Sequence, residues 1–385
     1  MKQIPECFQT TPIVYAVGKS YQIMVPVTRE TLMWAEVGGK CYYDDVNGIM
    51  RSNCTTHRVT VPMEVLDTAG KYKICYRIVK ERKPYFSEVG DVCEYHSAFY
   101  PVKGGTVRFY HIADTHNMVE KPVAAAKAFG KIDFLILNGD LPNHSGDIAN
   151  FTTIHEIASE ITGGEIPVVF SRGNHDMRGI YAENIAEHTP TDCGRSYFTF
   201  RLGTVWGMVL DCGEDKVDSH PEYAHTICCT DFRQRQTAFI KNVIRCASEE
   251  YAAEDIRIRM VISHVPFTEH FEAPFDIEEE TYAEWTRLLR EEIHPQMMLC
   301  GHIHRAYITP IGGEKDHLGQ PCPVIVGSAP GTSAEGQDWI STKDVYIGTG
   351  FEADSSGCKI SFIGSNSKCY HDAHLSYKEN KPQNG

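Results

Sequence analysis

Five short runs of Asp, Asn and His residues occur along this 385-residue chain, and each follows an apolar stretch. Their oxygen and nitrogen donors suit transition metals such as Mn, Fe or Zn. Placement after predicted strands lets residues that are distant in sequence meet at one edge of a sheet. The runs therefore predict a two-metal hydrolytic site. They are Asp114-x-His116, Gly139-Asp140, Gly173-Asn174-His175-Asp176, His264 and Gly301-His302-Ile303-His304.

The first two runs are weak signals when taken alone. Asp114 and His116 are spaced so that one loop can wrap both donors around an ion, although Asp114 could equally cap a helix or a turn. Gly139 permits close approach of the backbone, and Asp140 after it can bridge two cations. Their order along the chain and their shared position after strands give them weight.

The third run is more specific. Asn174 can bind a metal through its amide oxygen, while His175 would point towards the substrate as a proton donor to the leaving-group oxygen. Asp176 would orient the His175 ring and favour its charged form. The alternative is a structural turn with Asn174 in left-handed geometry.

The last two runs contribute imidazoles. A single histidine such as His264 is more often structural than a ligand, and its context alone makes it a candidate. In Gly301-His302-Ile303-His304, the loop can send its two imidazoles to different ions.

Two regions must position these residues. The first hundred residues alternate short β-rich runs with turns, which is typical of a small all-β sandwich of the fibronectin or immunoglobulin kind. We expect this accessory domain to span residues 1–104 and to carry no catalytic group. Its predicted strands are residues 13–17, 21–27, 32–37, 57–62 and 71–79.

After a glycine-containing linker near residue 104, apolar strands alternate with helical segments, which predicts an α/β domain over residues 105–364. A closing hairpin is expected at residues 345–351 and 359–363, followed by a loose polar tail over residues 365–385. The predicted strands are residues 107–113, 134–137, 167–170, 197–201, 205–210, 259–262 and 297–299, and the predicted helices are residues 119–129, 147–161, 231–247 and 279–292.

Composition limits the partners. Lys and Arg number 37 against 51 Asp and Glu, and the formal charge of −14 opposes binding to nucleic acid. No run approaches the roughly 20 apolar residues of a membrane span, and the N-terminus does not open a signal peptide, so we expect a cytoplasmic protein without a membrane partner. The 14 cysteines are dispersed and are expected to be reduced. A small-molecule substrate remains the expected partner.

Together the five runs resemble the motif set of the calcineurin-like metallophosphoesterases, over residues 107 to about 363. The resemblance implies a four-layer α/β/β/α fold and two divalent ions, Mn, Fe or Zn, with Mg also possible. It implies hydrolysis of a phosphomonoester or phosphodiester by a metal-bound hydroxide, with His175 as the catalytic histidine. By matching motifs, the first ion would be held by Asp114, His116, Asp140 and His304, and the second by Asp140, Asn174, His264 and His302.

At several positions the sequence can be compared with two groups of this family, the protein phosphatases and the purple acid phosphatases. Arg172 is similar to the arginine before Gly-Asn-His in protein phosphatases and would contact the phosphate, or it forms a salt bridge instead. The Asp-Arg-Gly that follows Gly-Asp in those enzymes is missing here. The two-domain layout is similar to purple acid phosphatases, but Leu141, Pro142 and Asn143 replace their iron-binding tyrosine. No purple Fe(III) site is therefore expected.

Other candidates lie near residue 211. Asp211 and Glu214 could reach the substrate, although turn capping is the stronger interpretation. Residues 215–227 are a candidate specificity loop. Two other functions remain possible: a metal-binding scaffold without activity, and a nuclease.

Overall fold

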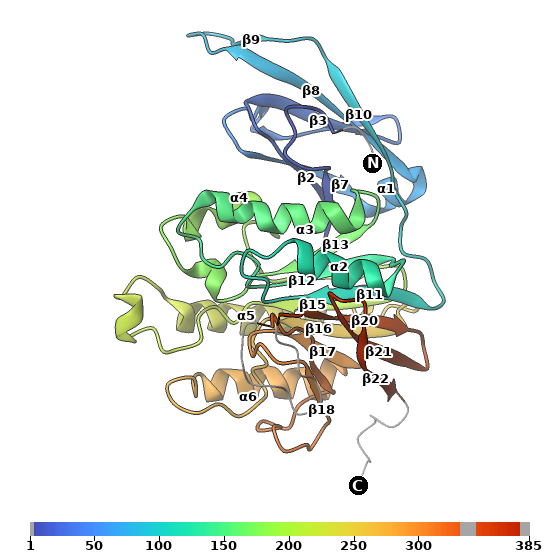
Figure 1. Cartoon of the computed structure of the whole chain (residues 1–385), viewed down its shortest axis with the longest axis vertical. Coiled ribbons are helices and arrows are strands. Elements are labelled where there is room, and N and C mark those ends of the chain that lie inside the picture. Colours follow the sequence, from blue (N-terminus) through green and yellow to red (C-terminus); the bar gives the residue numbers. More distant parts are fainter. Residues whose placement is uncertain (1–3, 332–343, 378–385) are drawn as a thin grey trace.

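The computed structural model describes residues 4–331 and 344–377. The molecule is elongated, with N-terminal strands at one end and helices on both sides of two central sheets at the other (Figure 1). The central sheets face one another across a shared core, in which Phe109 and Ile136 of the first sheet join Val209 and Met260 of the second. The predicted mixture of an α/β region and a strand-rich N-terminal region is confirmed.

The first central sheet has parallel strands at its middle. Strands β11, β12 and β13 are mostly apolar and almost wholly buried, as expected for parallel strands covered on both faces. Three antiparallel strands extend one edge and three N-terminal strands extend the other. In spatial order the sheet is β22 (Cys369–Ser376), β21 (Gly357–Gly364), β20 (Ile347–Ala353), β11 (Val107–Ile112), β12 (Phe134–Asn138), β13 (Pro167–Ser171), β1 (Ile13–Val17), β2 (Ser20–Pro26) and β7 (Thr56–Pro62).

The second central sheet begins with an antiparallel pair and continues with parallel strands. The antiparallel pairing of β14 with β15, two strands predicted from the sequence, places Phe198 opposite Val209. Strands β15, β16, β17 and β19 run parallel. The order is β14 (Phe198–Leu202), β15 (Val205–Leu210), β16 (Ile258–Ser263), β17 (Met297–Cys300), β19 (Val324–Val326) and β18 (Tyr307–Thr309).

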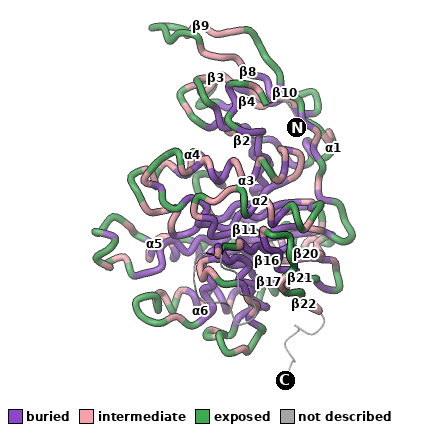
Figure 2. Tube along the Cα trace, in the orientation of Figure 1, coloured by how far each residue is buried: buried purple, intermediate pink, exposed green. Residues whose placement is uncertain are grey.

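Helices cover the outer faces of both sheets. Helices α2 and α3 pack their apolar residues on the outer face of the first sheet, and α5 and α6 do so on the second. Asp147 accepts a hydrogen bond from the Ala149 amide at 2.9 Å and so caps the segment leading into α3. The helices are α1 (Met63–Ala69), α2 (Glu120–Phe129), α3 (Thr152–Thr162), α4 (Ile185–His188), α5 (Cys229–Arg245) and α6 (Glu279–Leu288). Figure 2 shows the buried residues concentrated in the sheets between them.

Three of the N-terminal strands belong to the first central sheet, and the division into domains at residue 104 stays a prediction. Strand β1 pairs in parallel with β13, placing Val14 opposite Pro167, so the first central sheet continues into the N-terminal region. The remaining strands form a sheet of their own that packs on β2 and β7 through Met33 and Ile74. That sheet contains β10 (Cys93–Ala98), β8 (Lys71–Glu81), β3 (Thr31–Val37) and β4 (Lys40–Tyr43), with β9 (Glu88–Val89) on β8; β5 (Asp45–Val46) and β6 (Ile49–Met50) pair separately.

The expected loose tail is partly ordered. Residues 369–376 form β22, which pairs antiparallel with β21 and places Ile360 opposite Ala373. The predicted hairpin of β20 and β21 is confirmed, and β22 adds a further edge strand to it. Residues 378–385 of the tail lie outside the described residues. Among the described helices, none combines the length and apolar character of a membrane span.

Candidate metal centre

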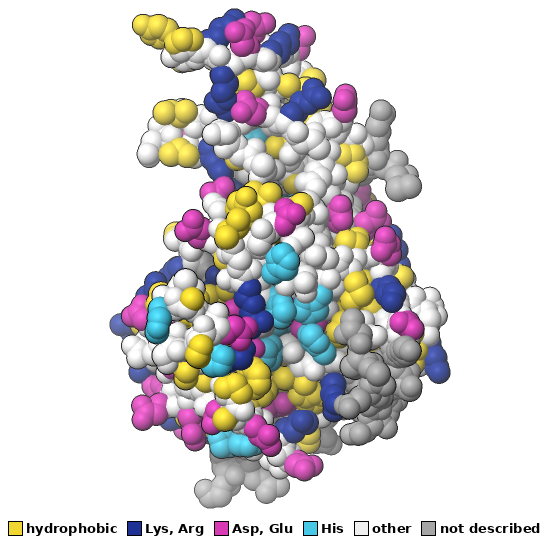
Figure 3. Space-filling model, turned by 60° about the vertical axis from the view of Figure 1, so that its left-hand side comes forward, with side chains coloured by type: hydrophobic (Ala, Val, Ile, Leu, Met, Phe, Trp, Pro, Cys, Tyr) yellow, Lys and Arg dark blue, Asp and Glu magenta, His cyan; other side chains and the backbone are white. Residues whose placement is uncertain are grey.

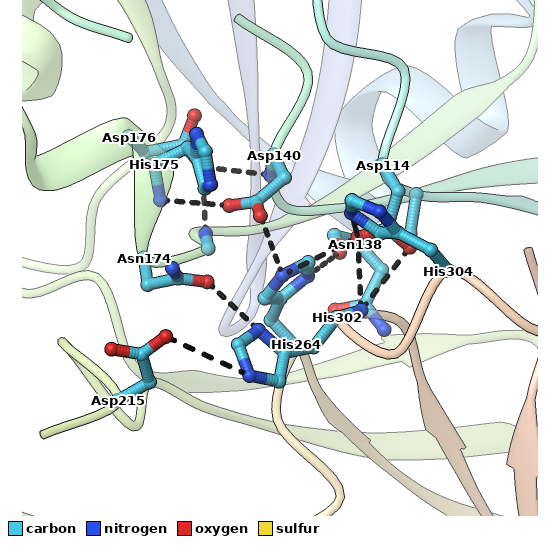
Figure 4. A network of polar contacts seen from close by, with 12 residues as sticks. Asp114, Asn138, Asp140, Asn174, His175, Asp176, Asp215, His264, His302 and His304 are labelled. Atoms are coloured by element: carbon cyan, nitrogen blue, oxygen red, sulfur yellow. Dashed lines mark hydrogen bonds and ion pairs between the residues drawn. The ribbon is translucent and has the colours of Figure 1, made fainter. Parts of the chain in front are cut away.

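All five polar runs meet where strands of the two central sheets end. Asp114, Asp140 and Asn174 follow β11, β12 and β13 of the first sheet. His264 and His302 follow β16 and β17 of the second sheet. Figure 4 shows these side chains turned towards one another from both sheets. The pairing of the sheets therefore brings together residues that lie up to 190 positions apart, because Asp114 and His304 belong to one group of donors within 4.8 Å of each other.

The backbone at these positions is unusual. Five of the seven candidate ligands have positive φ angles, a region that non-glycine residues rarely occupy. Such conformations cost on the order of 1–3 kcal/mol each and persist mainly at functional sites, where the surrounding fold enforces them. The five are Asp114 (54°), His116 (45°), Asp140 (54°), His302 (70°) and His304 (58°).

Two glycines make the close packing of these loops possible. A Cβ on Gly139 would lie 2.6 Å from the Gly173 backbone, and a Cβ on Gly173 would lie 2.2 Å from Asp140 Oδ1. Either side chain would push the two loops apart. The glycines of the Gly139-Asp140 and Gly173-Asn174 runs are thus required by space at the site.

The first group of donors contains Asp114, His116 and His304. The Nε2 atoms of His116 and His304 are 2.9 Å apart, and His304 Nε2 lies 3.6 Å from Asp114 Oδ1. Burial lowers the pKa of His116 to about 4, so its ring is neutral near pH 7. A neutral His116 imidazole and a second imidazole, that of His304, facing a carboxylate form a set of donors suited to a divalent ion.

The second group contains Asp140, His264 and His302. His264 Nε2 lies 3.1 Å from Asp140 Oδ2, and the amide oxygen of Asn174 lies 3.0 Å from His302 Nδ1. His264 Nε2 is buried, and the group that it faces is the Asp140 carboxylate. A buried imidazole nitrogen aimed at a buried carboxylate fits a metal ligand.

Asp140 stands between the two groups. Its Oδ2 faces His264, and its carboxylate also belongs with His116 in a set of donors within 4.8 Å of one another. Burial alone would raise the pKa of Asp140, but the His264 imidazole outweighs it and lowers that pKa. Burial would likewise lower the pKa of His264, but Asp140 and then Asp114 raise it to about 10. An ion binding at His264 would therefore displace a proton.

Residues behind the candidate ligands hold them in place. His264 Nδ1 donates to the Asn138 carbonyl oxygen at 2.7 Å, which directs Nε2 towards Asp140. Asp114 accepts hydrogen bonds from the His302 amide at 2.9 Å and from the Ser328 hydroxyl. Metal-binding histidines and carboxylates commonly have such supporting hydrogen bonds. The donor set and its supporting hydrogen bonds fit divalent ions, provided that His264 loses its proton on binding.

His175 lies beside the ligands, and its ring is oriented differently from our expectation. Its Nδ1 donates to the Asn143 carbonyl oxygen at 2.8 Å, and its Nε2 lies 3.3 Å from Arg178 Nη1. Asp176 does not touch the ring. Instead its Oδ2 accepts from the Gly173 amide at 2.6 Å and the Asp140 amide at 3.3 Å. Burial and the nearby Asp140 charge raise the pKa of Asp176 to about 7. Asp176 therefore organises the loop backbone and does not orient the histidine.

Arg172 is also placed differently from the phosphate contact that we expected. Its Nε donates to Asp211 Oδ2 at 2.7 Å, and its guanidinium lies over the Phe232 ring. Asp211 also accepts from the Gly213 amide at 2.9 Å, so it combines the predicted turn cap with a salt bridge. The salt-bridge interpretation of Arg172 is the one that the structure supports.

The sequence analysis did not predict that Arg178, Glu214 and Asp215 form a cluster beside the site. Arg178 forms a two-pronged ion pair with Glu214 at 2.9 and 2.8 Å and also lies 3.4 Å from Asp215. Asp215 Oδ2 lies 3.9 Å from His302 Nε2. The one sequence signal for Arg178 is its position three residues after His175. The loop after β15 thus reaches the metal centre through Asp215, whereas the sequence marked it only as a specificity loop.

Comparison with known proteins bears on this geometry. Residues 107–306 match the model of the calcineurin-like phosphoesterases, and this range covers more than half of the chain and includes all seven candidate ligands. The chain belongs to the calcineurin-like phosphoesterase family. No curated protein matches this calcineurin-like phosphoesterase closely enough to count as a relative.

Solved structures extend the likeness to the N-terminal region. A purple acid phosphatase from yellow lupin (Lupinus luteus) seeds aligns with a TM-score of 0.60 and 11% identity, covering 97% of this chain and 76% of that one. Vps29 from Chaetomium thermophilum aligns with a TM-score of 0.29 and 11% identity, covering 70% and 97%. The lupin structure supports the overall fold, including the strand-rich N-terminal region. At this identity it supports the fold alone.

Proposed function

We propose that this calcineurin-like phosphoesterase is a dinuclear metal-dependent enzyme that hydrolyses a phosphomonoester or phosphodiester of a small organic molecule. The observation that carries the proposal is the position of Asp140 between two groups of donors. A carboxylate shared by two ions is typical of centres that hydrolyse phosphoesters.

The donor groups indicate which residues hold each ion. Asp114, His116 and His304 with Asp140 would bind the first ion, and Asp140, His264 and His302 with Asn174 the second. When bound, two divalent ions lower the pKa of a water molecule and neutralise charge on the phosphoryl oxygens. Mixed nitrogen and oxygen donors favour Mn, Fe or Zn, with Mg also possible.

His175 is the proposed proton donor to the leaving-group oxygen. Its Nδ1–H is held by the Asn143 carbonyl, so Nε2 is the nitrogen that exchanges the proton. The Arg178 guanidinium can only donate hydrogen bonds, so in its contact with His175 the Nε2 atom is the acceptor. The contact must loosen when Nε2 takes up the proton that it later donates. Arg178 in turn is held by Glu214, and this chain of contacts sets the position of the His175 ring.

A metal-reconstitution assay tests the proposal. The purified chain is stripped of metal, loaded separately with Mn, Fe, Zn and Mg, and assayed on a generic aryl phosphate and an aryl phosphodiester. We expect turnover with at least one of the first three ions and none after chelation. Inactivity at full metal occupancy would favour a scaffold, and salt-dependent binding to DNA or RNA would favour a nuclease.

A further inference from the structure

A cavity of about 190 Å³ opens beside the metal centre, where strands of the second central sheet end. Its walls come from the loops after β15, β16, β17 and β18 and from the start of α6. His302 and Asp215 line it, so it is continuous with the second group of metal donors. A single water needs only about 10–15 Å³ on the same measure, so the cavity has room for an organic group.

Aromatic rings form much of the cavity wall. Phe267 and Tyr282 are buried, with exposures of 2% and 6%, while Phe271 and Phe275 lie towards the opening. Figure 3 shows histidine side chains gathered on this side of the molecule, with hydrophobic side chains beside them. An apolar group of a substrate would bury its surface against these rings.

The charged residues of the wall share one sign. The described lining residues include five carboxylates and three histidines but no Lys or Arg. Two carboxylates already have cationic partners: Glu214 pairs with Arg178 and Asp215 with Lys216 at 2.9 Å. The remaining three are Glu269, Asp276 and Glu279.

None of these three carboxylates forms an ion pair with a Lys or Arg among the described residues, while Lys216 Nζ lies 5.0 Å from the centroid of the Phe275 ring. Glu269 is 5% exposed and accepts hydrogen bonds from Tyr307 at 2.7 Å and Thr309 at 2.6 Å, which hold its carboxylate in place. Glu279 faces the histidine His317 at 3.6 Å. Aromatic faces next to carboxylates are the environment in which proteins bind ammonium groups.

We infer that the cavity binds the organic part of the substrate and that this part is apolar in body and carries an ammonium-type positive charge. The inference rests on the proposed phosphoesterase function and specifies its substrate class. The phosphoryl group would lie at the metal centre, and the cationic group would extend past His302 and Asp215 to the aromatic wall. An anionic organic group would instead meet the carboxylates and be disfavoured.

The kinetic test uses two substrates of the same shape and different charge, choline phosphate and 3,3-dimethylbutyl phosphate. The measured quantity is the ratio of their kcat/KM values, compared between variants so that the difference in leaving group cancels. In Asp276→Asn/Glu279→Gln we expect the ratio to fall about three- to tenfold, because each lost carboxylate removes an attraction to the ammonium group.

Glu280→Gln is the matched control. Glu280 is exposed, follows Glu279 on α6 and does not line the cavity, so the same charge is lost from the same helix outside the site. We expect its ratio to stay within about twofold of the wild type, because Glu280, unlike Asp276 and Glu279, does not line the cavity and solvent separates its charge from the bound ammonium group. An unchanged ratio in the double variant, or a fall of equal size in Glu280→Gln, would overturn the inference.

A binding measurement separates this inference from the proposed function. Choline and its neutral isostere 3,3-dimethylbutan-1-ol are titrated into the metal-loaded protein by calorimetry, without any turnover. Tighter binding of choline, weakened in the double variant, supports the cavity even if the protein hydrolyses no aryl phosphate. Turnover of aryl phosphate without preferential choline binding would leave the function standing and refute the cation-binding cavity.

Discussion

Replacing Arg172 distinguishes a structural role from a substrate-binding role. Arg172 precedes Gly173 in the candidate metal centre, yet its Nε donates to Asp211 at 2.7 Å, and the Asp211 side chain is fully buried. In Arg172→Met the aliphatic packing against Phe232 is largely kept, while the positive charge is lost. Asp211 is then left as a buried carboxylate without a cation.

The expected cost follows from the contacts that remain. Breaking a buried ion pair from one side costs about 3–5 kcal/mol. Asp211 still accepts from the Ser196 hydroxyl at 2.6 Å and the Gly213 amide at 2.9 Å, so we expect a loss near the lower end, about 3 kcal/mol. Urea unfolding of the metal-loaded protein measures this loss, and KM for an aryl phosphate should change less than about twofold.

Two further variants complete the test. Arg195→Met removes an exposed arginine that pairs with Asp192, and it should cost at most about 1 kcal/mol. Adding Asp211→Asn to Arg172→Met should recover part of the lost stability, because no uncompensated buried charge remains. A tenfold rise in KM with unchanged stability would refute this account and restore Arg172 as a phosphate ligand.

Three shorter predictions concern the site and its surroundings. His175→Ala should lower kcat by about 10²–10⁴-fold with metals retained, less on aryl phosphates with good leaving groups, and an equal loss on all leaving groups would contradict an acid role. Gly173→Ala should lower metal stoichiometry, because its Cβ would lie 2.2 Å from Asp140 Oδ1, whereas Gly104→Ala, with only an ordinary contact at 3.5 Å, should not. Burial lowers the pKa of His155 to about 4, so the unfolded chain binds more protons below its usual pKa near 6.5. Stability should therefore fall as pH drops from about 6.5 to 4, with a shallower fall in His155→Gln, as urea unfolding at each pH would show.

The sequence was sufficient to predict local structure at the site. Strand β12 and its neighbours read as apolar runs, and polar residues directly after them had to lie at the strand ends. Because the ends of parallel strands share one edge, the convergence of Asp114, Asp140 and Asn174 followed from local patterns alone. The positive φ angles of Asp114 and Asp140 were not predictable from the sequence, in which the one related signal is the glycine before Asp140.

Pairings between distant segments were not predictable from these patterns. An apolar run such as residues 13–17 indicates a buried strand, but it does not say which strand lies beside it. The parallel pairing of β1 with β13 joins residues about 150 positions apart, and it places three N-terminal strands in the first central sheet. Strand β22 was missed for a related reason, since its partly exposed polar residues resemble those of a loose tail.

The hydrogen-bond partners of individual side chains could not be predicted from the sequence either. Asp176 was expected beside His175, but its carboxylate turns to the amides of Gly173 and Asp140. A backbone carbonyl, that of Asn143, holds the His175 ring instead, and every residue type offers such an acceptor. Residue types can indicate a metal centre, but they do not specify contacts made by the backbone.

Metal stoichiometry in the wild type and in Asp140→Asn tests the central claim most directly. Asp140 lies between both groups of donors, and an amide in its place cannot supply the shared negative charge. After reconstitution and removal of free metal, elemental analysis should find two ions per wild-type chain and fewer than one per Asp140→Asn chain, with circular dichroism confirming that the variant is folded. One ion in the wild type, or two ions in a folded Asp140→Asn variant, would contradict the shared dinuclear centre.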